Sequence, residues 1–133
     1  MRDNRGIYTM KIIATLTLMM CLLPSGVRAD DDAAAEIDYL LRSIGSSGCA
    51  FVRNGKRHDS REAEDHLRMK YRKAKRYAST SEKFIDRLAS KSSLSRNPYF
   101  IECDGDERIA SGEWLVQLLI EYRAGSHDER RKP

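Results

Sequence analysis

Two cysteines, Cys49 and Cys103, constrain the fold of this chain more than any other feature of its sequence. They lie about 54 residues apart, and a disulfide between them would stabilise the folded state by roughly 4 kcal/mol in the chain-entropy model. Disulfides persist in oxidising compartments outside the cytoplasm. The N-terminal segment therefore decides whether we expect a disulfide here or, as the alternative, two free buried thiols.

The first 29 residues have the pattern of a secretory signal peptide. Three basic residues precede an apolar run of about a dozen residues, from 12 to 23. The helix-breaking segment 24–26 follows, and Val27 and Ala29 are small enough for the pockets of signal peptidase. We therefore expect cleavage after Ala29 and a periplasmic or secreted protein.

Three alternatives stay open at this end of the chain. The segment could remain as an uncleaved anchor, although a membrane-spanning helix needs roughly 20 apolar residues. Cys21 could carry a lipid, but the bulky Met20 stands where lipid attachment favours a small residue. Met10 could also be the true start, because the residues before it add little to the signal.

Cleavage after Ala29 would change both the charge and the cysteine count of the chain. It removes four bases and one acid, so the formal net charge falls from +4 to +1. It also removes Cys21 and leaves Cys49 and Cys103 to pair. A nearly neutral, exported chain is a poor candidate for nucleic-acid binding. We expect no nucleic-acid partner, no membrane span after cleavage and no cofactor.

The mature chain fits one small α+β domain closed by one disulfide. We expect about four helices packed on a short antiparallel sheet, which consists of a hairpin and one further strand. Residues 30–35 are expected to be an acidic lead-in, 36–123 a single globular domain, and 124–133 a disordered charged tail.

The expected elements follow from apolar periodicity and from turn and cap residues. Asn54-Gly55 is a strong hairpin signal, because both residues tolerate a positive φ. The predicted helices begin near Ile37, at Arg61 after an Asp59 or Ser60 cap, after a Ser79 cap and at Glu113. The predicted strands cover 49–53, 56–58 and 99–103, with a loop at 90–97 and a polar turn at 104–110.

Two basic residues fit a purely structural role poorly. Lys70 falls inside the apolar stripe of the second helix, with His66 at its edge, so its amine must snorkel outward or meet a partner. Arg53 lies on the cysteine side of its strand. It could clamp an acidic ligand, although we favour pairing with a nearby carboxylate such as Glu62 or Glu102.

Glu62 and His66 are the candidate catalytic residues, because they lie one turn apart on the second helix. A zincin site would need a second histidine around the glutamate, and that pattern is absent from the sequence. We therefore predict no metal site. No nucleophile elbow occurs either, so we expect a non-catalytic protein. The alternative is a small envelope enzyme that uses Glu62, His66 and Lys70.

Two surfaces could contact partners. The basic run 68–76 follows acidic residues in the first turns of the same helix, which suits the helix dipole and a solvated face. Binding to an anionic envelope surface is the weaker alternative for this run. Val116 and Ile120 point away from the main apolar stripe of the last helix, so a homodimer could form through them.

A series of short motifs occurs in order along nearly the whole mature chain. These motifs are 49–55 (CAFVRNG), 62–63 (EA), 66–67 (HL), 70–71 (KY), 81–82 (SE), 84–85 (FI), 98–103 (PYFIEC), 114–115 (WL) and 122–123 (YR). Together they resemble a family of exported proteobacterial proteins, the domain of unknown function 5329. His58 departs from the pattern, since an aromatic residue is expected there.

The resemblance implies a small periplasmic or secreted domain and supplies no activity. It points to the positions that the residues themselves single out, so the candidate ligand-binding set is Arg53, Asn54, His66 and Lys70. We expect an accessory or binding protein whose partner is an envelope protein, a peptide or a cell-wall polymer.

Overall fold

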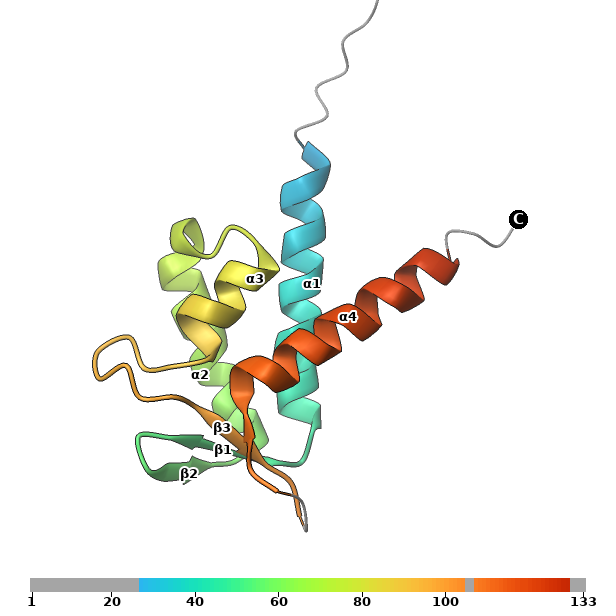
Figure 1. Cartoon of the computed structure of the whole chain (residues 1–133). Coiled ribbons are helices and arrows are strands. Elements are labelled where there is room, and N and C mark those ends of the chain that lie inside the picture. Colours follow the sequence, from blue (N-terminus) through green and yellow to red (C-terminus); the bar gives the residue numbers. More distant parts are fainter. Residues whose placement is uncertain (1–26, 105–106, 130–133) are drawn as a thin grey trace, which may run out of the picture.

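The computed structural model describes residues 27–104 and 107–129, which form a small α+β domain (Figure 1). This confirms the predicted fold class. The predicted signal peptide lies outside the described residues up to position 26. The described helices are α1 (Val27–Ser46), α2 (Ser60–Ala74), the 3-10 helix η1 (Lys75–Tyr77), α3 (Ser81–Phe84), the π-helix η2 (Ile85–Ala89) and α4 (Ser111–Glu129).

The strands form an antiparallel sheet in the order β2-β1-β3-β4. Their bounds are β1 Ala50–Arg53, β2 Lys56–His58, β3 Phe100–Glu102 and β4 Ile109–Ala110. The predicted hairpin is confirmed, since Asn54 and Gly55 connect β1 to β2 with φ values of 50° and 76°. The sequence missed β4 and placed a polar turn there, because two residues paired with β3 carry no alternating pattern of their own.

The predicted disulfide is confirmed and joins the two central strands. Cys49 and Cys103 lie one residue beyond β1 and β3, directly across the register that pairs Ala50 with Glu102. Their Cα atoms are 4.3 Å apart. The bond therefore closes the sheet at the end where the chain arrives from α1.

The core lies between the helices and one face of the sheet. The predicted stripe of α1 is buried, and α1 packs against α2, α3 and α4 above the sheet (Figure 1). The sheet contributes Phe51, Tyr99 and Ile101 from its inner face. The other large members of the core are Ile37, Leu40, Leu41, Ile44, Leu67, Phe84, Ile85, Leu88, Leu115 and Leu119.

The structure confirms the sequence prediction for the N-terminal cap of α2 but not for that of α3. Of the two caps predicted for α2, Asp59 and Ser60, the structure has Asp59, whose carboxylate accepts a hydrogen bond of 2.8 Å from the Glu62 amide. The predicted Ser79 cap of α3 is wrong. Thr80 holds that place and accepts from the Lys83 amide, so the helix begins one residue later.

The structure also differs from the prediction at both ends of the domain. Residues 30–35, predicted as a loose lead-in, belong to α1, which begins at Val27. α4 continues to Glu129, into the segment 124–133 that we expected to be disordered. A helix that is anchored by packing propagates through polar residues, because each added residue forms a backbone hydrogen bond without needing an apolar stripe.

A polar cluster joins α1, α3 and α4 at the end of the core away from the sheet. Arg123 donates to both carboxylate oxygens of Glu36, at 2.7 and 2.8 Å, and forms an ion pair of 2.8 Å with Glu82. Ser81 Oγ donates to Glu36 at 2.6 Å. The Arg123 guanidinium, and then the Ser81 hydroxyl, hold the pKa of Glu36 below its ordinary value against the opposing effect of burial.

Substitution of Arg123 by Gln is expected to lower the free energy of unfolding by about 1 kcal/mol at neutral pH, since the pair is partly exposed. Because the pKa of Glu36 is lowered in the folded state, its contribution is present above the ordinary glutamate pKa and is lost as the pH falls through the lowered value. Urea unfolding at neutral and acidic pH measures both effects. Arg72→Gln removes the same charge from an exposed position of α2 and is the control, and an equal loss in both variants would contradict the prediction.

Candidate functional site

The four candidate ligand-binding residues lie in one pocket, which we call the cationic pocket. Its volume is about 360 Å³. The residues that line it are Arg53, Asn54, His66, Lys70, Ser92, Ser93, Leu94 and Tyr99. They come from the end of β1, the hairpin turn, α2, and the segment between η2 and β3, so the pocket forms only when these four parts of the chain pack together.

Local structure explains why these side chains converge. Arg53 shares a face of β1 with the buried Phe51, which directs it toward the helices. His66 and Lys70 are four residues apart on α2, so they lie on one side of that helix, a turn apart. Tyr99 immediately precedes β3 and is only 3% exposed, which makes it a wall between the pocket and the core.

Lys70 lines the cationic pocket and is held there by two contacts. Its Nζ donates a hydrogen bond of 2.6 Å to the carbonyl oxygen of Leu88 and lies 5.3 Å from the centroid of the Tyr99 ring. Burial, and then the positive charge of Arg53, lower the pKa of Lys70 to about 8. The amine is therefore charged at neutral pH, and an anion in the pocket would stabilise that charge.

The other titratable groups of the pocket respond to the same surroundings. Burial lowers the pKa of His66, and the charges of Arg53 and Lys70 lower it further, so the imidazole is neutral at neutral pH. Burial raises the pKa of Tyr99, which keeps its hydroxyl protonated. The pocket thus offers two cationic groups, a neutral imidazole and hydroxyl donors.

The pocket contains no carboxylate among the residues that the structure describes. The sequence favoured pairing of Arg53 with a nearby acid, but no such ion pair occurs in the described part of the chain. Glu102 binds Arg57 and Arg108, and Glu62 binds His58. The charge of Arg53 is therefore available to a ligand, which suits an anion.

The segment between η2 and β3, which the sequence predicted only as a loop, forms one wall of the pocket. Its backbone is closed by hydrogen bonds from the Ser92 amide to the Asn97 carbonyl and from the Arg96 amide to the Ser92 carbonyl. Ser95 Oγ donates to Asn54 Oδ1 at 2.9 Å and ties the segment to the hairpin turn. Its cluster of serines was the signal available in the sequence.

Glu62 does not join the pocket. Its carboxylate lies 2.7 Å from Nδ1 of His58, the last residue of β2, and its side chain is 58% exposed. The structure therefore brings His66 and Lys70 together and leaves Glu62 outside. Within residues 27–104 and 107–129, no group of three or more His, Cys, Asp or Glu side chains is placed to hold a metal ion.

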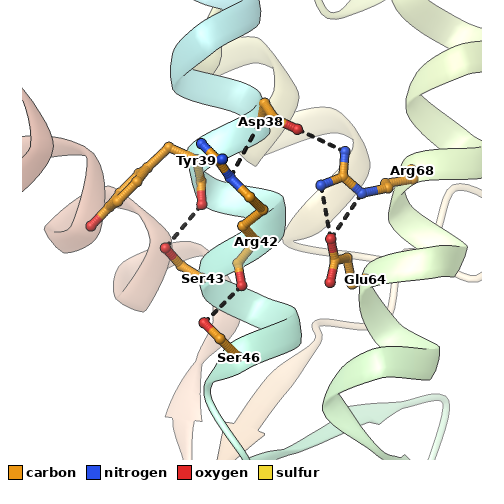
Figure 2. A network of polar contacts seen from close by, with 7 residues as sticks. All are labelled: Asp38, Tyr39, Arg42, Ser43, Ser46, Glu64 and Arg68. Carbon is orange, nitrogen blue, oxygen red and sulfur yellow. Dashed lines mark hydrogen bonds and ion pairs between the residues drawn. The ribbon is translucent and has the colours of Figure 1, made fainter.

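The basic run 68–76 is divided by the fold. Figure 2 shows the Arg68 guanidinium between Asp38 of α1 and Glu64 of α2, which it binds at 2.8 Å each. Lys70 faces the pocket, whereas Arg72 and Lys73 are exposed. Arg68, at the beginning of the run, thus connects α2 to α1 by an ion pair, whereas the later part of the run lies at the surface.

Val116 and Ile120 are exposed on α4, by 45% and 55%, as their positions on the helix predict. The homodimer through this face stays a prediction. In the part of the chain that the structure describes, no helix combines the length and the apolar character needed to cross a membrane.

Comparison with known proteins bears on the same region. A family profile described as "Family of unknown function (DUF5329)" matches residues 31–123. The chain belongs to this family. It is also 33% identical over 90 residues to the "Uncharacterized protein YfeK" of Salmonella typhimurium, an alignment that covers 67% of this chain and 75% of that protein. No solved structure matches the chain.

Membership of DUF5329 confirms the resemblance that the motifs suggested. The matched residues include every residue of the cationic pocket, from Arg53 to Tyr99. The family description carries no activity, so the chemistry of the pocket has to support any functional conclusion about this DUF5329 member.

Proposed function

We propose that this protein is an exported, non-catalytic binding protein that holds an anionic group of its ligand in the cationic pocket. The ligand belongs to a protein, a peptide or a cell-wall polymer of the periplasm or the external medium. The observation that carries the proposal is the convergence of Arg53, His66 and Lys70 in a pocket without a carboxylate among its described residues.

Two independent features support the export of this protein. The first 29 residues have the pattern of a signal peptide. The Cys49–Cys103 disulfide is the kind of bond that persists in an oxidising compartment. A protein at this location meets peptides and polymers that carry carboxylates and phosphates, and an arginine next to a lysine is suited to bind them.

The absence of a catalytic role is supported by how the pocket residues are held. A general base needs a group that orients it and a pKa near the working pH. The carboxylate one helical turn before His66 on α2, that of Glu62, binds His58 instead of His66. Lys70 already donates to the Leu88 carbonyl, which suits a fixed positive charge.

The proposal is tested by titrating the mature protein with sodium N-acetylglutamate and inorganic phosphate and following backbone amide shifts by NMR. We expect shifts at Arg53, Asn54 and Ser92–Leu94, and a dissociation constant that rises about tenfold or more in Arg53→Gln. Arg72→Gln removes an equal charge from the exposed face of α2 and is the matched control.

Two results would contradict the proposal. If Arg53→Gln and Arg72→Gln weaken binding equally, the anion responds to overall charge and not to the pocket. If the protein turns over substrates in a broad hydrolase screen and His66→Ala abolishes that turnover, the protein is an enzyme.

A further inference from the structure

A second hollow lies on the opposite face of the sheet, and we call it the outer hollow. Its volume is about 400 Å³. The residues that line it are Val52, Asn54, Gly55, Arg57, Asn97, Pro98, Phe100 and Arg108. Val52 and Phe100 face each other across the β1–β3 register, on the side of the sheet away from Phe51.

The outer hollow has an apolar floor and a basic rim. Val52, Pro98 and Phe100 provide the apolar surface, and the Arg108 guanidinium lies 5.2 Å from the centroid of the Phe100 ring. Arg57 and Arg108 both bind the Glu102 carboxylate. The Glu102 carboxylate therefore already has two partners. The apolar floor of the outer hollow suits an apolar side chain of a ligand.

The hairpin turn separates the outer hollow from the cationic pocket. Asn54 lines both of them. The segment that precedes β3 also borders both, with Ser92–Leu94 on the cationic pocket and Asn97–Pro98 on the outer hollow. A ligand that fills one of the two hollows thus reaches the edge of the other.

The hairpin turn between the two hollows is tied to the neighbouring segment through Asn54. Asn54 has a φ of 50° in the hairpin turn, and its Oδ1 accepts from Ser95. Its side-chain Nδ2 has no partner within the described residues, so it remains a donor for a carbonyl group. A donor between an anion site and an apolar site is suited to a ligand whose backbone crosses the turn.

We propose that the ligand is an acidic peptide that crosses Asn54, with a carboxylate side chain in the cationic pocket and an apolar side chain in the outer hollow. This inference rests on the proposed function of the cationic pocket. The Asn54 amide donates to a backbone carbonyl between the two side chains. Residues of an extended peptide are spaced by roughly 3.3 Å, so a short segment joins two adjacent hollows.

The chemistry of both hollows favours a peptide over an acidic glycan. Sugar hydroxyls need acceptors as well as donors, and carboxylates are the strongest acceptors that proteins offer. Neither hollow has a carboxylate among its described lining residues. The apolar floor around Phe100 matches a leucine or phenylalanine side chain.

The test measures binding of the mature protein to synthetic peptides by calorimetry. The peptides carry one glutamate and one phenylalanine, separated by none to three glycines, and are capped at both ends. We expect the best spacing to bind at least about tenfold tighter than the same peptide with glycine in place of phenylalanine. Phe100→Ala should remove that advantage and leave the affinity of the glycine peptide unchanged.

Further variants keep the test informative. Arg108→Gln changes the exposed rim of the outer hollow and serves if Phe100→Ala fails to fold, as judged by thermal unfolding. Arg53→Gln should weaken the binding of every peptide that carries glutamate. Replacing glutamate with glutamine should weaken binding in the unchanged protein.

Several outcomes would overturn the inference. One is equal affinity for the phenylalanine and glycine peptides at all spacings. Another is tighter binding of tetragalacturonate, an acidic glycan, than of every peptide. In both cases the cationic pocket would still bind anions, whereas failure of N-acetylglutamate and all peptides to bind would refute the proposed function itself.

Discussion

Reduction of the Cys49–Cys103 disulfide is expected to lower the free energy of unfolding by roughly 4 kcal/mol. The bond closes a loop with a sequence separation of 54, which holds α2, α3 and the wall of the cationic pocket. Opening that loop increases the conformational freedom of the unfolded chain. For a domain of this size, such a loss is a large part of the total stability.

Urea unfolding of the oxidised and reduced protein measures this effect. The double variant Cys49→Ser with Cys103→Ser is the control, because its stability should match that of the reduced protein and should not respond to reductant. Intact mass with and without reductant verifies the bond. Equal unfolding midpoints for the oxidised and reduced protein would contradict the prediction.

Anion binding is expected to weaken as the pH rises through about 8, because Lys70 then loses its charge. Burial disfavours the charged amine in the free protein, and a bound anion favours it. Below pH 8 the affinity should be nearly constant, and above it the affinity should fall by up to about tenfold per pH unit. Lys70→Gln should bind about 10- to 100-fold more weakly at pH 7 and should lose this pH dependence.

The stability of the folded protein depends on pH in the opposite direction. The pKa of Lys70 is lowered in the folded state, so the charged amine opposes folding, and stability rises as the pH increases from about 8 toward the ordinary lysine value. Titrations with N-acetylglutamate between pH 6 and 10 test the binding effect. Lys73→Gln, at an exposed position of the same helix, is the control. Identical pH profiles for Lys70→Gln and the unchanged protein would show that another group titrates.

The two predictions differ in what the sequence could supply. Cys49 and Cys103 could be paired before the structure because export and the count of remaining cysteines leave one partner for each. The position of Lys70 in an apolar stripe indicated an unusual environment. Its hydrogen bond to the Leu88 carbonyl, and its closeness to Tyr99, depend on η2 and β3, which are distant in the chain.

The partners of charged residues were the least predictable part of the site. Arg53 was expected to pair with an acid, and the alternative of an enzyme required Glu62 to lie beside His66. In the structure Glu62 binds His58, and Glu102 binds Arg57 and Arg108. Several acids and bases lie within reach of one another along the sequence, and small differences in burial and geometry choose among them.

Short-range physics determined what the sequence revealed by itself. Apolar spacing located the buried face of α1 and of α2, Asn54-Gly55 specified the hairpin, and Asp59-Ser60 specified a helix start. Each of these features depends on residues within a few positions of one another. The sequence therefore determined the α+β class and the elements that carry Arg53, His66 and Lys70.

Only the tertiary structure decided that these side chains share a pocket and that a second hollow adjoins it. Both hollows depend on the packing of β1 against β3 and on the segment that joins η2 to β3, which Ser95 ties to Asn54. Such contacts connect residues about 40 positions apart. No local pattern encodes them, because the balance of packing, burial and hydrogen bonding over the whole domain selects them.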